Sequence, residues 1–223
     1  MIKRILFRIL YPLSKIYLSK ERTYKYNDIT VKVLPEVFHP GLFFSTKILL
    51  NYLKSIELNE KTLLEFGAGT GLISIFVSKQ NAKVTATDIN PTAIKNIELN
   101  AKKNDVELNI IQSDLFDNIP PQIFEIIIIN PPYFPKDPKN NNEYAWFCGS
   151  DFRFFKNLFT QIGDYISAST KTIMILSEDC DIEKIKSIAK KNSFALTEIH
   201  KERIWNEWNY LFNITPQLMP NER

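Results

Sequence analysis

An asparagine, two prolines and a tyrosine stand in a row, Asn130-Pro131-Pro132-Tyr133, in a chain of 223 residues. The asparagine side chain can accept and donate hydrogen bonds, and the tyrosine ring can lie flat against a planar group. The prolines fix the turn and add no N–H donors that would compete. This Asn-Pro-Pro-Tyr motif is therefore a candidate for holding and orienting a planar polar group without a nucleophilic cysteine or histidine.

A glycine-rich turn, residues 64–71, is the second candidate. Its glycines, at positions 67, 69 and 71, stand where a strand turns sharply into a helix and a ligand must approach backbone N–H groups closely. The dinucleotide-binding fingerprint has its third glycine one residue further on, so this spacing disfavours NAD. The turn alone is a weak signal, because some glycine-rich turns only let a helix pack closely.

Two aspartates extend the pattern. Asp88 ends the strand predicted after the glycine-rich turn, where a carboxylate can accept both hydroxyls of a ribose. Asp114 ends the next predicted strand, beside the place where an adenine would lie. Each acid alone could be a helix cap or a solvated turn residue. Together with the glycines, they predict an adenosine pocket.

The segments that must position these residues alternate between strand and helix patterns. Strands are predicted at residues 62–66, 83–87, 106–112, 125–129 and 172–176, and helices at 45–54, 72–79, 91–103, 152–167 and 182–191. The last two strands are predicted at 195–204 and 210–215, as an antiparallel pair with a turn near Asn206. This order predicts an α/β fold, with a mostly parallel sheet covered by helices on both faces.

Four isoleucines, residues 126–129, lead directly into the Asn-Pro-Pro-Tyr motif. Such an uninterrupted apolar run is typical of a central parallel strand buried on both faces. Ligands of parallel sheets bind outside the carboxyl ends of the strands. We therefore expect the isoleucines to deliver Asn130 to the same sheet edge as the glycine-rich turn and the two aspartates.

The net charge of +3 has its basic excess at the N-terminus, and the remainder of the chain is slightly acidic. Residues 1–17 carry apolar side chains at helical spacing, with a kink at Pro12, and residues 23–33 alternate as a β-hairpin would. We expect residues 1–37 to form a basic appendage and residues 38–223 the main domain. The helix either packs with its charges solvated or contacts RNA, an acidic protein or a membrane surface.

Composition limits the other classes of function. Hydrophobic residues make up 44% of the chain, which is enough for one substantial core. Cys148 and Cys180 provide neither a disulfide framework nor a zinc-binding spacing, and two histidines leave little for a metal site. We expect a cytoplasmic protein with no signal peptide and no transmembrane segment.

Four motifs carry a family resemblance. Residues 64–71, 88–91, 113–115 and 130–133 resemble the ordered motifs of class I S-adenosylmethionine-dependent methyltransferases. Within that superfamily, the chain most resembles the small HemK-like branch, which includes the release-factor glutamine methyltransferases. Residues 40–46 resemble the segment that closes over the cofactor, and residues 143–149 the loop after the catalytic motif. The resemblance implies a Rossmann-like fold of seven mostly parallel strands with an antiparallel C-terminal hairpin.

The resemblance also implies site residues. S-adenosylmethionine is expected to contact Thr46, Glu65, Gly67, Ala68, Gly69, Gly71, Asp88, Ile89, Asp114, Leu115 and Asn130. The implied catalytic residues are Asn130, Pro131, Pro132 and Tyr133. The asparagine side-chain oxygen and the Pro131 carbonyl would accept both N–H groups of a planar, conjugated NH₂. Its nitrogen lone pair would then face the methyl group of the cofactor.

The acceptor stays open at this point. It is either the glutamine amide of a protein such as a release factor, or the exocyclic amine of adenine or guanine in RNA or DNA. The helical release-factor-binding domain of longer family members has no counterpart in the sequence, and the acidic main domain disfavours nucleic acid. The alternatives from other classes are a non-catalytic interaction module that retains the fold and a nicotinamide-dependent oxidoreductase.

Overall fold

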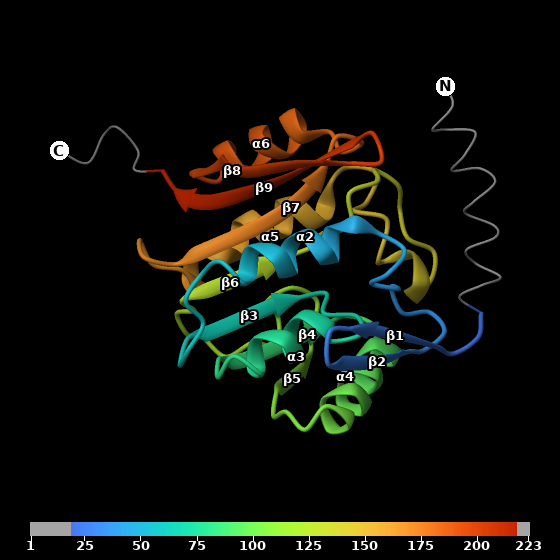
Figure 1. Ribbon diagram of the computed structural model, residues 1–223. Helices are drawn as coiled ribbons and strands as arrows, with labels where there is room; N and C mark the ends of the chain where they lie inside the picture. Colours follow the sequence, from blue (N-terminus) through green and yellow to red (C-terminus); the bar gives the residue numbers. More distant parts are fainter. Residues whose placement is uncertain (1–18, 218–223) are drawn as a thin grey trace.

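The computed structural model describes residues 19–217, which form a seven-stranded sheet and a two-stranded hairpin (Figure 1). The sheet has the order β5-β4-β3-β6-β7-β9-β8. Strand β9 runs antiparallel to its neighbours β7 and β8, whereas the pairings from β5 to β7 are parallel. The predicted α/β fold, with its mostly parallel sheet and antiparallel C-terminal hairpin, is confirmed.

The bounds of the elements are as follows. The hairpin is β1 (Arg22–Tyr26) and β2 (Ile29–Val33), and the sheet contains β3 (Thr62–Phe66), β4 (Lys83–Asp88), β5 (Asn109–Gln112), β6 (Ile126–Ile129), β7 (Lys171–Ser177), β8 (Phe194–Ile204) and β9 (Glu207–Pro216). The α-helices are α2 (Phe44–Leu53), α3 (Leu72–Ser78), α4 (Pro91–Lys103), α5 (Arg153–Gln161) and α6 (Ile182–Lys191), and short 3₁₀ helices are η1 (Asn141–Glu143) and η2 (Ile162–Tyr165).

Strand β6 separates two hydrophobic cores. Ile126 and Ile128 belong to the core that includes α2 and α3, whereas Ile127 and Ile129 belong to the core that includes α5 and α6. All four side chains are at most 2% exposed. Because alternate side chains of a strand point to opposite faces, a strand covered on both sides needs an uninterrupted apolar run. The isoleucines therefore fix the strand that ends at Asn130.

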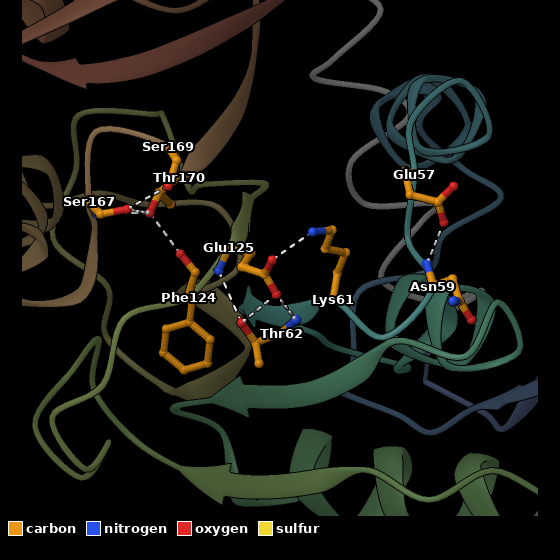
Figure 2. A network of polar contacts seen from close by, with 9 residues as sticks. All are labelled: Glu57, Asn59, Lys61, Thr62, Phe124, Glu125, Ser167, Ser169 and Thr170. Carbon is orange, nitrogen blue, oxygen red and sulfur yellow. Dashed lines mark hydrogen bonds and ion pairs between the residues drawn. The ribbon is translucent and has the colours of Figure 1, made fainter.

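At their amino ends, β3 and β6 are joined by a closed set of polar contacts (Figure 2). Lys61 Nζ lies 2.7 Å from Glu125 Oε1, and the Thr62 backbone N–H donates to Glu125 Oε2 at 3.0 Å. In return, the Glu125 N–H donates to the Thr62 hydroxyl at 3.1 Å. Beside them, Thr170 Oγ1 donates to the Phe124 carbonyl oxygen at 2.7 Å. The donors and acceptors of these residues are thus paired with each other, and the bonds help to fix the register of the strands.

The hairpin is fastened to α4 by asparagine side chains. Asn96, Asn100 and Asn104 are spaced four residues apart, so they lie on one face of the helix. Their Oδ1 atoms accept the backbone N–H groups of Leu34, Lys32 and Thr30 at 2.9, 2.8 and 3.1 Å. Asn100 also donates to the Thr70 carbonyl oxygen at 2.9 Å. This asparagine ladder therefore connects the hairpin with the glycine-rich turn.

Some boundaries differ from those predicted. The strand predicted from residue 106 begins at Asn109, because the Val106 N–H closes the end of α4 by donating to Ala101 O at 3.2 Å. The helix predicted for residues 152–167 is α5 followed by η2, and it starts after Phe152, whose φ is 63°. The predicted turn near Asn206 is confirmed, since Trp205 and Asn206 have φ values of 48° and 65° between β8 and β9.

The helix predicted for residues 1–17 lies outside the described residues. The division of the chain at residues 37 and 38 stays a prediction. Within residues 19–217, no helix has both the length and the apolar character needed to cross a membrane.

Candidate functional site

A cavity of about 430 Å³ opens at the carboxyl edge of the sheet, where β3 and β6 are paired. The chain continues from β3 to β4 on one side and later returns to β6 on the other, so the strand order reverses here. Parallel α/β sheets bind their ligands at such a point. Gly67, Gly69, Asp88, Asp114 and Asn130 line the cavity. The structure therefore brings the predicted motifs together.

The glycine-rich turn needs its glycines for two reasons. Gly67 and Gly71 have φ values of 62° and 75°, which side chains other than glycine adopt at a cost. A Cβ added to Gly67 would meet no atom within 4 Å, whereas a Cβ added to Gly71 would lie 3.1 Å from Ile97 on α4. Gly67 thus keeps the cavity open, and Gly71 allows α4 to pack against the turn.

Asp88 is locked in place by the backbone. Its Oδ2 accepts the Gly69 N–H at 3.0 Å, and its Oδ1 accepts the Asn90 N–H at 2.9 Å. Each carboxylate oxygen keeps a second lone pair, so the side chain can also accept hydrogen bonds from a ligand in the cavity. Burial raises the pKa of Asp88, while the bonds from Asn90 and Gly69 act in the opposite direction.

Glu65 lies beneath the turn and has a structural contact. Its Oε2 accepts the backbone N–H of Ser74 at 2.8 Å and also the Ser74 hydroxyl, which joins β3 to α3. Burial raises the pKa of Glu65 to about 8. The side chain is 5% exposed and is not among the residues that line the cavity. Any influence of Glu65 on a ligand therefore passes through the shape of the turn.

Asp114 and Arg153 lie on the cavity wall beyond β5. Burial raises the pKa of Asp114 most, the carboxylate of Asp117 raises it further, and the charge of Arg153 opposes both. Arg153 also pairs with Asp137 at 3.2 Å, in the segment after the Asn-Pro-Pro-Tyr motif. The sequence did not single out Arg153, which belongs to the first turn of α5 and carries no motif of its own.

Asn130 is oriented by a residue distant in the sequence. Its Nδ2 donates to the hydroxyl of Ser45, at the start of α2, over 3.2 Å. Pro131, Pro132 and Tyr133 line the same cavity. Burial raises the pKa of Tyr133, so its hydroxyl is neutral at physiological pH. This edge therefore combines the Asn130 side-chain amide with a neutral aromatic ring.

Three aromatic rings pack together at the cavity. Phe38 and Phe43 are stacked with centroids 5.0 Å apart, and Trp146 lies 4.9 Å from Phe43 in an edge-to-face arrangement. All three residues line the cavity. They join the segment before α2 to the loop after the Asn-Pro-Pro-Tyr motif, which are the two flanks that the family resemblance singled out. The packing itself could not be read from the sequence.

The predicted site residues divide into two groups. Those that line the cavity are Gly67, Gly69, Asp88, Ile89, Asp114, Leu115, Asn130, Pro131, Pro132 and Tyr133. Within the described part of the chain, the cavity lining does not include Thr46, Glu65, Ala68 and Gly71. These four lie in the turn, the strand and the helix that shape the cavity. Cys148 is 2% exposed, and burial raises its pKa to about 11, so a thiolate nucleophile is disfavoured there.

The residues present fit S-adenosylmethionine. Asp88 offers fixed acceptors at a strand end, where ribose hydroxyls would donate, and Gly67 leaves open space above the turn. Apolar Ile89 and Leu115 line the wall near Asp114, as an adenine ring requires. The cavity continues from there to Asn130, so one ligand could reach from the aspartates to the Asn-Pro-Pro-Tyr motif.

Known proteins are similar to this chain in sequence. A protein of Methanocaldococcus jannaschii, provisionally named a protein N5-glutamine methyltransferase, is 44% identical over 131 residues, which cover 56% of this chain and 64% of that protein. The ribosomal RNA small subunit methyltransferase C of Hahella chejuensis is 32% identical over 167 residues, covering 70% of this chain and 48% of that protein. The chain thus matches less than two thirds of the length of either relative.

The fold is also found among solved structures. A methyltransferase from Pyrococcus furiosus superposes with a TM-score of 0.64 and 18% sequence identity, over 93% of this chain and 97% of that one. At this identity the likeness concerns the fold alone. The model of the methyltransferase small domain family matches residues 28–146, which is more than half of the chain and includes the glycine-rich turn, Asp88, Asp114 and the Asn-Pro-Pro-Tyr motif. The chain therefore belongs to the methyltransferase small domain family.

Proposed function

We propose that this chain is an S-adenosylmethionine-dependent N-methyltransferase that methylates the side-chain amide of a glutamine in a protein. The observation that carries the proposal is the position of the Asn-Pro-Pro-Tyr motif on the same cavity as Asp88 and the glycine-rich turn. The cofactor supplies an electrophilic methyl group. The residues of the chain have to bind it, bring the acceptor into line and exclude water.

The acceptor nitrogen is a poor nucleophile, because its lone pair is delocalised into the neighbouring carbonyl. Asn130 Oδ1 and the Pro131 carbonyl oxygen can accept its two N–H groups and hold the lone pair toward the methyl carbon. The nitrogen–carbon bond would form as the carbon–sulfur bond breaks, with S-adenosylhomocysteine as the leaving group, and the nitrogen would then lose one proton to solvent. Alignment of this kind can lower the barrier by up to roughly 7–11 kcal/mol.

The aromatic residues assist in two ways. Tyr133 can lie against the planar amide, and Phe38 and Trp146 can close the cavity to water. A dry cavity strengthens the hydrogen bonds to Asn130, because competing water is removed. No charged side chain is required to remove the proton before the transfer, since nitrogen becomes acidic only as the new bond forms.

The 44% identity to the M. jannaschii protein, whose provisional name specifies glutamine, favours a protein acceptor. A base in RNA is a second candidate, because the H. chejuensis relative is named for ribosomal RNA. The basic residues near the N-terminus, most of which lie outside the described part, would suit an RNA or an acidic protein partner. Deleting residues 1–17 is expected to leave cofactor affinity unchanged and to lower the rate on the true substrate.

The test is to incubate the protein with methyl-labelled S-adenosylmethionine and cell extract, and then to treat samples with protease or ribonuclease. Label that protease removes and ribonuclease leaves supports a protein acceptor, and the reverse result supports RNA. Acid hydrolysis sharpens the result, because cleavage of a methylated glutamine amide releases volatile labelled methylamine. The Asn130→Ala protein is the matched control. Absence of transfer in every fraction would instead favour the non-catalytic interaction module.

A further inference from the structure

The hydrogen bond between Ser45 and Asn130 joins two segments that are 85 residues apart. Both side chains line the cavity, and both are partly buried. Among residues 19–217, no other hydrogen bond of the Asn130 side chain is found. The orientation of this amide before a substrate arrives therefore depends on the Ser45 hydroxyl.

The two ends of the amide are chemically different. Oδ1 accepts hydrogen bonds, whereas Nδ2 only donates them, and a half-turn of the side chain exchanges the two. An acceptor NH₂ in the cavity is itself a donor, so it needs Oδ1 opposite it. If Nδ2 stood there, two donors would face each other. The rate of the proposed reaction should therefore depend on how the amide is held.

Ser45 is well placed to hold it. The residue belongs to the first turn of α2, whose Ile48, Leu49 and Leu53 are at most 2% exposed in the core. The helix is therefore a rigid support, and the short serine side chain loses little conformational freedom when it forms the bond. The bond engages Nδ2, and within residues 19–217 no hydrogen bond to Oδ1 is found, so Oδ1 is available as an acceptor.

We propose that Ser45 is a positioning residue for the methyl transfer, and that its hydroxyl keeps the Asn130 amide with Oδ1 toward the acceptor nitrogen. This inference rests on the proposed function. A hydroxyl could also donate to Oδ1 if the amide were turned around. With the acceptor NH₂ on one side and Ser45 on the other, however, the orientation with Oδ1 inward satisfies all the groups at once.

The first test is Ser45→Ala, measured as the initial rate of label transfer to the extract fraction that the wild type methylates, at saturating S-adenosylmethionine. The expected result is a kcat about fivefold lower, the factor expected for one neutral hydrogen bond. The affinity for S-adenosylhomocysteine, measured by calorimetry, should stay unchanged. Ser55→Ala is the matched control, because Ser55 lies just beyond the other end of α2 and bonds only within its own turn.

A second pair of variants separates the hydroxyl from the shape of the side chain. Ser45→Thr keeps the hydroxyl. Ser45→Val introduces a side chain of nearly the same shape as threonine but without the hydroxyl. Ser45→Thr should retain most of the rate, whereas Ser45→Val should lose as much as Ser45→Ala. This pair decides the question even if Ser45→Ala folds poorly.

Two further measurements exclude a merely structural role. In the Asn130→Ala background, Ser45→Ala should have no additional effect on kcat, because its partner is already absent. The side-chain ¹⁵N–¹H signals of Asn130, identified by their loss in Asn130→Ala, should shift in Ser45→Val and return in Ser45→Thr.

Equal rates for Ser45→Thr and Ser45→Val would overturn the inference. A further fivefold fall in kcat when Ser45→Ala is added to Asn130→Ala would also overturn it. The same holds if the Asn130 amide signals do not shift in Ser45→Val. Failure of the proposed function looks different, because the wild type itself would then transfer no label. The amide signals still report on the contact between Ser45 and Asn130 in that case.

Discussion

At the amino ends of β3 and β6, Glu125 is exposed and binds Lys61, whereas near the carboxyl end of β3 Glu65 is buried beneath the glycine-rich turn. The hydrogen bond from Lys61 is the largest cause that lowers the pKa of Glu125. Burial has the opposite effect on Glu65 and on Asp88, whose pKa values are raised.

The two ends of the sheet therefore treat polar groups differently. At the amino end, Lys61 and Glu125 bind each other (Figure 2), and both side chains are exposed to solvent. At the carboxyl end, Asp88 and Asn130 are held by protein on one side and keep hydrogen-bonding capacity toward the cavity. Burying polar groups whose hydrogen-bonding capacity is not fully used lowers the stability of the fold. Such groups are typical of functional sites. Changes at the carboxyl end should thus affect activity, and changes at the amino end only stability.

The largest effect is expected from Asn130→Ala. The variant removes one of the two proposed acceptors for the substrate NH₂ but leaves Asp88 and the glycine-rich turn in place. Because this bond strengthens as the nitrogen becomes positive, kcat should fall by roughly a hundredfold or more, equivalent to about 3 kcal/mol. Calorimetry should show that the variant still binds S-adenosylmethionine. A wild-type rate in this variant would rule out the proposed mechanism.

Asp88→Ala should have the next largest effect, on binding and not primarily on chemistry. Hydrogen bonds to a carboxylate are worth roughly 1.5–3 kcal/mol each, so S-adenosylmethionine affinity should fall tens-fold or more. The measurement is calorimetry on the folded variant, with Asp28→Ala, in the exposed β1–β2 turn, as the control. Unchanged affinity would remove Asp88 from the cofactor site.

Glu65→Gln tests the raised pKa of the buried carboxyl. Its folded pKa of about 8 lies above the ordinary value of 4.5, so between these values the folded state binds more protons than the unfolded state. The contribution of the Glu65 carboxyl to the free energy of unfolding is thus fully present below pH 4.5, and it is lost as the pH rises toward 8. Relative to Glu65→Gln, the wild-type melting temperature should fall by at least about 2–4 °C from pH 5 to pH 8. A difference that does not change with pH would contradict the raised pKa.

Glu125→Gln should have the smallest effect. The folded pKa of Glu125 lies below its ordinary value of 4.5, so its stabilising contribution is present above that pH and is lost as the pH falls through the folded pKa. The variant should melt slightly below the wild type at pH 7, and the difference should shrink toward pH 3. Methyl transfer and cofactor affinity should be unchanged. A loss of activity here would contradict the separation between the two ends of the sheet.

Much of the cavity could be predicted because its parts are local patterns. The glycines, Asp88, and Asn130 after four isoleucines each stand at a strand end, and the carboxyl ends of parallel strands meet at one edge. The boundaries of β5 and α5 were less predictable. They depend on how the chain closes α4 at Val106 and on the left-handed backbone at Phe152.

Contacts between distant segments could not be predicted. Asn96 and Asn100 are polar residues of α4, yet both are fully buried, and their side-chain oxygens accept backbone N–H groups of Leu34 and Lys32. The stacking of Phe43 on Trp146 joins two flanks that the sequence named without relating them to each other.

The sequence by itself determined the buried strand, the turn that follows it and the types of polar groups at the strand ends, because periodicity and turn chemistry act over a few residues. Only the tertiary structure decided that Glu65 supports α3 while Asp88 faces the cavity, and that Ser45 reaches Asn130. Such pairings depend on how helices pack on the sheet. No local pattern encodes the packing, because it is the sum of many weak contacts along the whole core.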